Sequence, residues 1–89
     1  MRGALGVFIV QPNPDSGWRL SNADSGEVTC FESGGQAERR AMALARQAHA
    51  MHGAGEVWVY DRLERLVGRW CVAAGGVSLI EPENTAQAA

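Results

Sequence analysis

Lysine is absent from this sequence, and all eight of its basic residues are arginines. The longest basic run is Arg39-Arg40, and the formal net charge is −2 at pH 7. A protein that binds duplex nucleic acid through its phosphates needs a basic face, so this charge balance argues against that class. Together with the many Ala and Gly residues, the exclusive use of arginine indicates a GC-rich bacterial gene.

Cysteine and histidine are scarce as well. Cys30 and Cys71 form no C-x-x-C pair, and a reducing cytosol does not favour a bridge between them, so we expect free, partly buried thiols. His49 and His52 lie three residues apart without a third ligand at a useful spacing, which makes a poor zinc site. The sequence therefore predicts no metal and no cofactor, and we interpret the two histidines as favourable charges near a helix C-terminus.

No catalytic constellation is visible. Nothing beside Cys30 resembles an activating base with an orienting third group, and the aspartates fall in expected turns. Gly34-Gly35 precedes a helix but lacks the lysine and the spacing of a phosphate-binding loop. From these absences we predict that the protein is not an enzyme.

Long apolar runs are also missing. The first apolar run ends at Gln11-Pro12-Asn13-Pro14, too early to span a bilayer, and shows no signal-peptide cleavage pattern. We therefore expect a cytoplasmic protein with no membrane partner. A length of 89 residues with 46% hydrophobic and 20% charged residues predicts one small globular domain, which we place at residues 1–75. From Glu81 onward the chain is polar and Ala-rich, and we expect a mobile tail over residues 76–89.

The most regular stretch runs from Ser33 to His52 and predicts one amphipathic helix. Ser33 and Gln36 have the spacing of a capping box, and Gly53 and Gly55 can leave the helix with positive φ. Apolar residues recur at helical spacing and predict a single apolar stripe. These residues are Ala37, Ala41, Leu44, Ala45, Ala48 and Met51.

The rest of the chain has strand-like segments separated by turn residues. We predict strands at Gly6–Gln11, Trp18–Ser21, Glu27–Phe31, Glu56–Tyr60 and Leu66–Ala73, with a charged loop at Asp61–Arg65 and a possible edge strand at Val77–Ile80. The predicted fold is α+β, in the order β-β-β-α-β-β, with a single helix packed on a mainly antiparallel sheet. The strand order within the sheet is left open.

This pattern resembles the DUF2188 family of small bacterial proteins over about residues 7–72. The matching positions are Val10, Gly17-Trp18, Phe31, Ser33, Ala37, Ala45-Arg46 and the run from Val57 to Tyr60. The resemblance implies the fold and no activity. The chain departs from the family at Asp61-Arg62-Leu63-Glu64, where the family hairpin turns on Asp-Gly. It also departs at Gly34 and Gly35, which lower helix propensity by about 1 kcal/mol each.

A single helix can cover only one face of the sheet. Along the strand at Glu56–Tyr60, Trp58 and Tyr60 point away from Val57 and Val59, so one pair of side chains faces away from the helix. The other strands are similarly apolar on both faces, which predicts a second apolar surface that carries Trp58 and Tyr60.

Several occupants of this surface remain open: a loop or the tail, a second copy of the chain, an unidentified protein, or a nucleic acid. We favour self-association, because a symmetric dimer is a common way for a small domain to bury an apolar face. The protein is then a noncatalytic self-association or protein-interaction module. The alternative is a nucleic-acid-binding module in which Trp58 and Tyr60 stack on bases while Arg39 and Arg46 on the helix contact phosphates.

Overall fold

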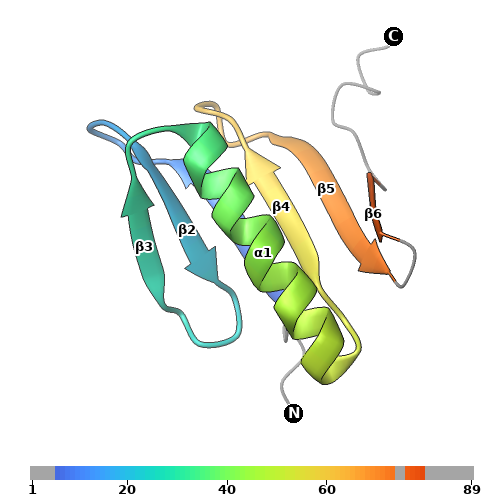
Figure 1. The fold of residues 1–89 in the computed structure, drawn as a ribbon. Coiled ribbons are helices and arrows are strands. Elements are labelled where there is room, and N and C mark those ends of the chain that lie inside the picture. The colour runs from blue at the N-terminus through green and yellow to red at the C-terminus, as the bar shows by residue number, and fades with distance from the viewer. Residues whose placement is uncertain (1–5, 74–75, 80–89) are drawn as a thin grey trace, which may run out of the picture.

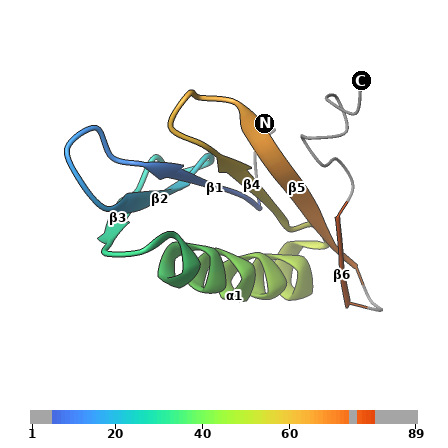
Figure 2. The same cartoon turned by 90° about the horizontal axis from the view of Figure 1, so that it is seen from above.

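The computed structural model describes residues 6–73 and 76–79, and in them one helix lies across one face of a six-stranded sheet (Figures 1 and 2). This architecture confirms the predicted α+β fold. The strands are β1 (Val7–Pro12), β2 (Trp18–Asn22), β3 (Val28–Phe31), β4 (Glu56–Tyr60), β5 (Leu66–Ala73) and β6 (Gly76–Leu79), and α1 spans Gly34–His52. Their order in the sheet is β3-β2-β1-β4-β5-β6.

The helix begins as the sequence predicts. Ser33 is the N-cap residue: its hydroxyl accepts from the Gln36 amide at 3.1 Å, and the Gln36 side chain accepts from the Ser33 amide at 3.3 Å. This capping box satisfies donors that the first helical turn leaves free. At the other end Gly53 has φ 85° and its amide donates to the His49 carbonyl, which confirms the predicted left-handed exit at Gly53, whereas Gly55 does not have positive φ.

The core lies between the helix and the sheet, and its helical half consists of alanines. Ala37, Ala41 and Ala45 are completely buried, and Ala48 is 9% exposed. Leu44 packs on the edge of this core, whereas Met51, the last residue of the predicted apolar stripe, is 67% exposed. Met51 lies in the last turn of α1, on the same flank of the helix as Leu44, and both residues line a groove beside the core. The sheet contributes Phe8, Val10, Leu20, Val57, Val59 and Val72.

The two faces of the strands alternate as the pattern predicts. In β1, Phe8 and Val10 are buried while Ile9 between them is half-buried. In β4, Val57 and Val59 are buried, so Trp58 and Tyr60 lie on the face away from the helix.

A parallel pair lies at the centre of the sheet, and the other pairs are antiparallel. The chain leaves β1 through β2 and β3 on one side, and α1 then returns it so that β4 pairs with β1 on the other side. Because the crossover brings the chain back to the end at which β1 began, β4 runs parallel to β1. Val7 is paired with Glu56 and Ile9 with Trp58.

The sheet extends further along the chain than the domain boundary expected after residue 75. Strand β6 pairs with β5 in antiparallel register, with Ala73 opposite Gly76 and Trp70 opposite Leu79. The possible edge strand is therefore present, and residues 76–79 belong to the sheet instead of the expected tail. The remainder of that expected tail, residues 80–89, lies outside the described residues.

The loop between β4 and β5 spans Asp61–Arg65, as predicted, and is organised by one carboxylate. Asp61 accepts from the backbone amides of Leu63 at 2.8 Å and Arg65 at 3.0 Å, and from the Arg65 side chain at 3.3 Å. The backbone hydrogen bond from Arg65 has the largest effect on the pKa of Asp61 and lowers it; loss of hydration opposes this, and the Leu63 amide and the Arg65 guanidinium lower the pKa further, so that it lies below its ordinary value. Glu64 has φ 62° in this loop, in the left-handed region.

Replacing Glu64 with glycine should raise the free energy of unfolding by about 0.5–1 kcal/mol, because glycine adopts positive φ without a Cβ clash. Glu64→Ala is the matched control: it removes the same charge but keeps a Cβ, so no comparable gain is expected. Urea denaturation of both variants measures the difference. Equal stability of the two variants would contradict this assignment of strain to Glu64.

Candidate functional site

The open face is the side of the sheet that α1 does not cover; we define it by Val7, Ile9, Glu56, Trp58, Tyr60, Val67 and Arg69. Strand pairing places residues of the open face directly opposite one another on neighbouring strands. Ile9 is opposite Trp58, which in turn is opposite Arg69 on β5. Strands β1, β4 and β5 thereby place an aliphatic, an aromatic and a cationic side chain next to each other.

Three side chains of the open face interact with one another. The Trp58 indole Nε1 donates to Glu56 Oε1 at 2.7 Å, and Arg69 Nε donates to the same oxygen at 3.2 Å. The Arg69 guanidinium carbon lies 5.1 Å from the centre of the Trp58 ring. The guanidinium therefore occupies one face of the indole through a cation–π contact, while the carboxylate holds both partners in place.

The surroundings of this cluster are mostly apolar and accessible. Val7, Ile9 and Tyr60 are half-buried, and Val67 is 37% exposed. On β2 this side of the sheet is polar, since it carries Arg19, opposite Cys30, and Ser21, opposite Val28. The apolar part of the open face is thus centred on β1, β4 and β5.

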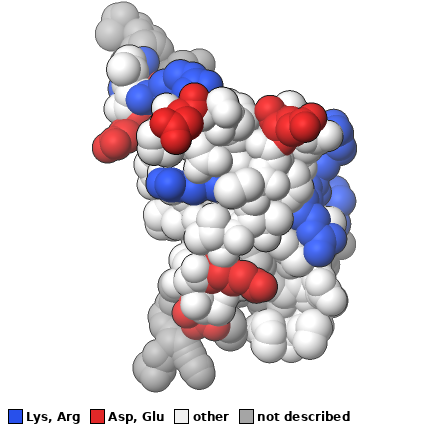
Figure 3. Space-filling view, turned by 90° about the vertical axis from the view of Figure 1, so that its left-hand side faces the viewer, with Lys and Arg blue, Asp and Glu red and all other residues white. Residues whose placement is uncertain are grey.

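The helix arginines do not join Trp58 and Tyr60. Arg39 and Arg46 are exposed on α1, which covers the other side of the sheet. In Figure 3, which shows the β3 side, basic side chains gather along the right-hand margin, on the helix side. The four predicted interaction residues therefore belong to two surfaces on opposite layers of the molecule, and a single flat contact cannot include both.

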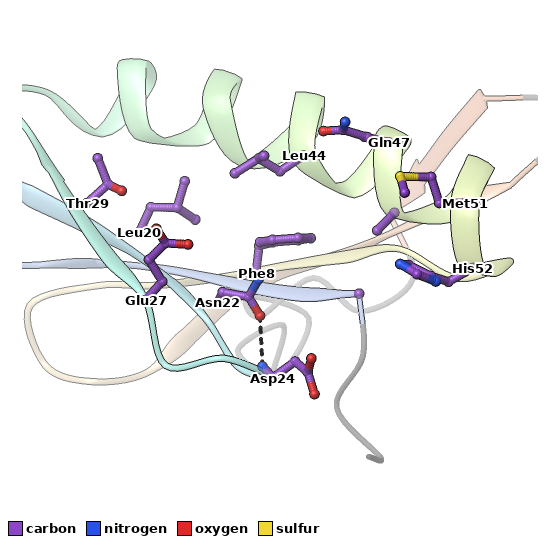
Figure 4. Close-up of a pocket in the computed structure, with 12 residues that line it drawn as sticks. Phe8, Leu20, Asn22, Asp24, Glu27, Thr29, Leu44, Gln47, Met51 and His52 are labelled. Atoms are coloured by element: carbon purple, nitrogen blue, oxygen red, sulfur yellow. Dashed lines mark hydrogen bonds between the residues drawn. The ribbon is translucent and has the colours of Figure 1, made fainter. Parts of the chain in front are cut away.

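A groove that was not predicted from the sequence lies on the helix side of the sheet, beside the C-terminal half of α1 (Figure 4). Its volume is about 290 Å³. Phe8, Leu20 and Leu44 form its apolar part, and Asp24 and Glu27 lie on its sheet side (Figure 4). The numbers of predicted helices and strands could have indicated this groove. A single helix is too narrow to cover every strand of a wide sheet, so part of the helix side of the sheet stays uncovered.

The remaining candidates are dispersed. His49 and His52 lie in the last turn of α1, as predicted. Both thiols are free, but Cys30 is exposed where partial burial was expected, and only Cys71 is half-buried. No group of three or more potential metal ligands occurs within residues 6–73 and 76–79. In that same part of the chain, α1 lacks the apolar length that crossing a membrane requires.

Comparison of the chain with family models, with curated proteins and with solved structures gives no match. The resemblance to the DUF2188 family accordingly rests on the motif residues alone.

Proposed function

We propose that this protein is a noncatalytic, DUF2188-like interaction module that forms a homodimer by packing two open faces together. The observation that carries the proposal is the combination of apolar area with internally paired polar groups. Trp58, Ile9 and Val67 offer contact area, while Glu56 and Arg69 neutralise each other within the face. Burying an isolated charge at the core of an interface is costly. Burying the Glu56–Arg69 pair avoids this cost, because each charge keeps its partner.

The same cluster makes base stacking on Trp58 less favourable. A nucleobase would compete with the Arg69 guanidinium for one face of the indole. The arginines that would contact phosphate in the nucleic-acid alternative lie on the helix layer, away from the aromatic side chains. These two facts support self-association over the nucleic-acid alternative. Free thiols and an arginine-only basic set support the further proposal that the module acts in a bacterial cytoplasm.

Substitution of Trp58 by lysine tests the proposed dimer. An aromatic residue at the centre of an interface commonly contributes 2 kcal/mol or more, so the dimer dissociation constant should rise at least about thirtyfold. Sedimentation velocity over a concentration series measures this constant. The matched control is Leu63→Lys, which places the same cation at an apolar residue 68% exposed in the β4–β5 loop, and it should leave the constant unchanged.

A wild-type protein that stays monomeric at its highest soluble concentration would overturn the proposal, as would equal weakening by both lysine variants. Titration with a single-stranded oligonucleotide at low salt addresses the alternative function. Binding that Trp58→Lys abolishes in a monomeric protein would favour the nucleic-acid module instead.

A further inference from the structure

Strand β3 forms one edge of the sheet and has few of the features that protect natural edges. Among the described residues no strand lies on its outer side, and its register with β2 is unbroken. Val28 is 53% exposed, Thr29 and Cys30 are exposed, and no proline, lysine or other charged residue occurs within Val28–Phe31. An exposed strand of this kind presents backbone donors and acceptors to which an extended segment can add as a further strand.

The groove of Figure 4 adjoins this edge on the helix side. Thr29 of β3 and Glu27 just before it line the groove, together with Leu44 and Met51 of α1. Alternate side chains of an added strand would point towards the helix layer, where only the small Thr29 separates them from the groove. The apolar floor could therefore accept one aliphatic side chain from the added strand.

The carboxylates beside the groove favour a bound segment that is basic over one that is acidic. Asp24 and Glu27 are exposed beside the groove, and the salt bridges described for residues 6–73 involve neither of them. The helix residues that line the groove carry no permanent charge. The end of β3 nearest Glu27 is therefore acidic, and a partner with a basic residue at that end would gain a favourable ion pair.

We propose that an extended peptide segment binds as an added strand along β3, with one aliphatic side chain in the groove. The centre of this segment is uncharged and β-branched, and a lysine or arginine stands at each of its ends. A second copy of this chain fits less well. Glu27 and Glu32 flank β3 itself, so an antiparallel pair of β3 strands would bring the Glu32 carboxylate of one copy towards Glu27 of the other. This binding uses a surface separate from the open face and does not depend on the dimer.

Synthetic peptides test the proposal on the unmodified protein. The probe is Lys-Val-Thr-Val-Thr-Val-Lys, and the comparison peptides carry Glu in place of both Lys residues or Pro in place of the central Val. At low salt the Lys-flanked peptide should bind about tenfold more tightly than the Glu-flanked one. The proline peptide should bind at least about tenfold more weakly than the probe, because it cannot donate through the central amide. Bound peptide should slow amide hydrogen exchange in β3 and leave exchange in β6 unchanged.

Charge reversal on the protein provides the second readout. Asp24→Lys with Glu27→Lys should invert the preference, so that the Glu-flanked peptide binds more tightly. The control combines Asp15→Lys with Glu64→Lys, which makes the same change in net charge at exposed turn residues away from the groove and should keep the original preference. None of these four side chains belongs to the core.

Four results would overturn the proposal: absence of measurable peptide binding, equal binding of the Lys-flanked and Glu-flanked peptides, undiminished binding of the proline peptide, or protection confined to strands other than β3. Concentration-dependent self-association that slows exchange in β3 would identify a second copy as the occupant instead.

Discussion

Gly55→Ala should lower the free energy of unfolding by about 3 kcal/mol, the upper end of the usual cost of overpacking a core. A Cβ built on Gly55 would lie 2.1 Å from the Ala45 carbonyl oxygen and 2.9 Å from its carbonyl carbon. Both atoms belong to the backbone of the helix, so no side-chain rotation can relieve the contact. The helix or the start of β4 would have to move, and Ala45 is completely buried. Urea denaturation measures the loss.

Gly35→Ala is the matched control for this substitution. Gly35 lies in the first turn of α1, where an added Cβ meets only a terminal nitrogen of Arg39 at 3.7 Å. Alanine has the higher helix propensity, so this variant should be more stable than wild type by about 0.5 kcal/mol. A loss of similar size in both variants would show that the approach of Gly55 to Ala45 is not the cause.

The second large effect is expected from Ala41→Leu, which should destabilise the fold by about 2–3 kcal/mol. Ala41 is completely buried at the centre of the alanine stripe, where the small side chains allow α1 to pack closely on the strands. A leucine there needs three further carbon atoms of space in a packed core, so it must push the helix away from the sheet. Thermal and urea unfolding both measure this change.

Ala43→Leu places the same side chain at an exposed position on the same helix. Leucine and alanine have similar helix propensities, so the stability of this variant should stay within about 0.5 kcal/mol of wild type. If Ala41→Leu were equally mild, the core would contain more free space than the complete burial of Ala41 indicates.

Much of the local structure could be predicted because its causes lie within a few residues. The capping box requires only Ser33 and Gln36 at the correct spacing, and the alternation of Val57, Trp58, Val59 and Tyr60 follows from the geometry of any strand. The limits of β4 and β5 agree with prediction. The start of β3 moved from Glu27 to Val28 because the Glu27 amide bonds to the Ser25 hydroxyl within the preceding turn.

The candidate site was predicted only in part. Strand alternation placed Trp58 and Tyr60 on the side away from the helix, but it could not show that Arg69 lies over the indole, because that contact requires the register between β4 and β5. Helical spacing placed Met51 in one apolar stripe with the buried alanines, yet it is exposed beside the groove, because periodicity does not show which flank of a helix its neighbours cover. The separation of Arg39 and Arg46 from the aromatic residues likewise depends on the layering.

From the sequence by itself came the elements, their caps and the faces of each strand, since covalent geometry and short-range hydrogen bonds determine these within one or two turns of chain. Only the tertiary structure decided that β4 lies parallel to β1, that β3 forms an edge, and that a groove remains beside α1. These features depend on which distant segments become neighbours, and that choice is made by packing energy summed over the whole core.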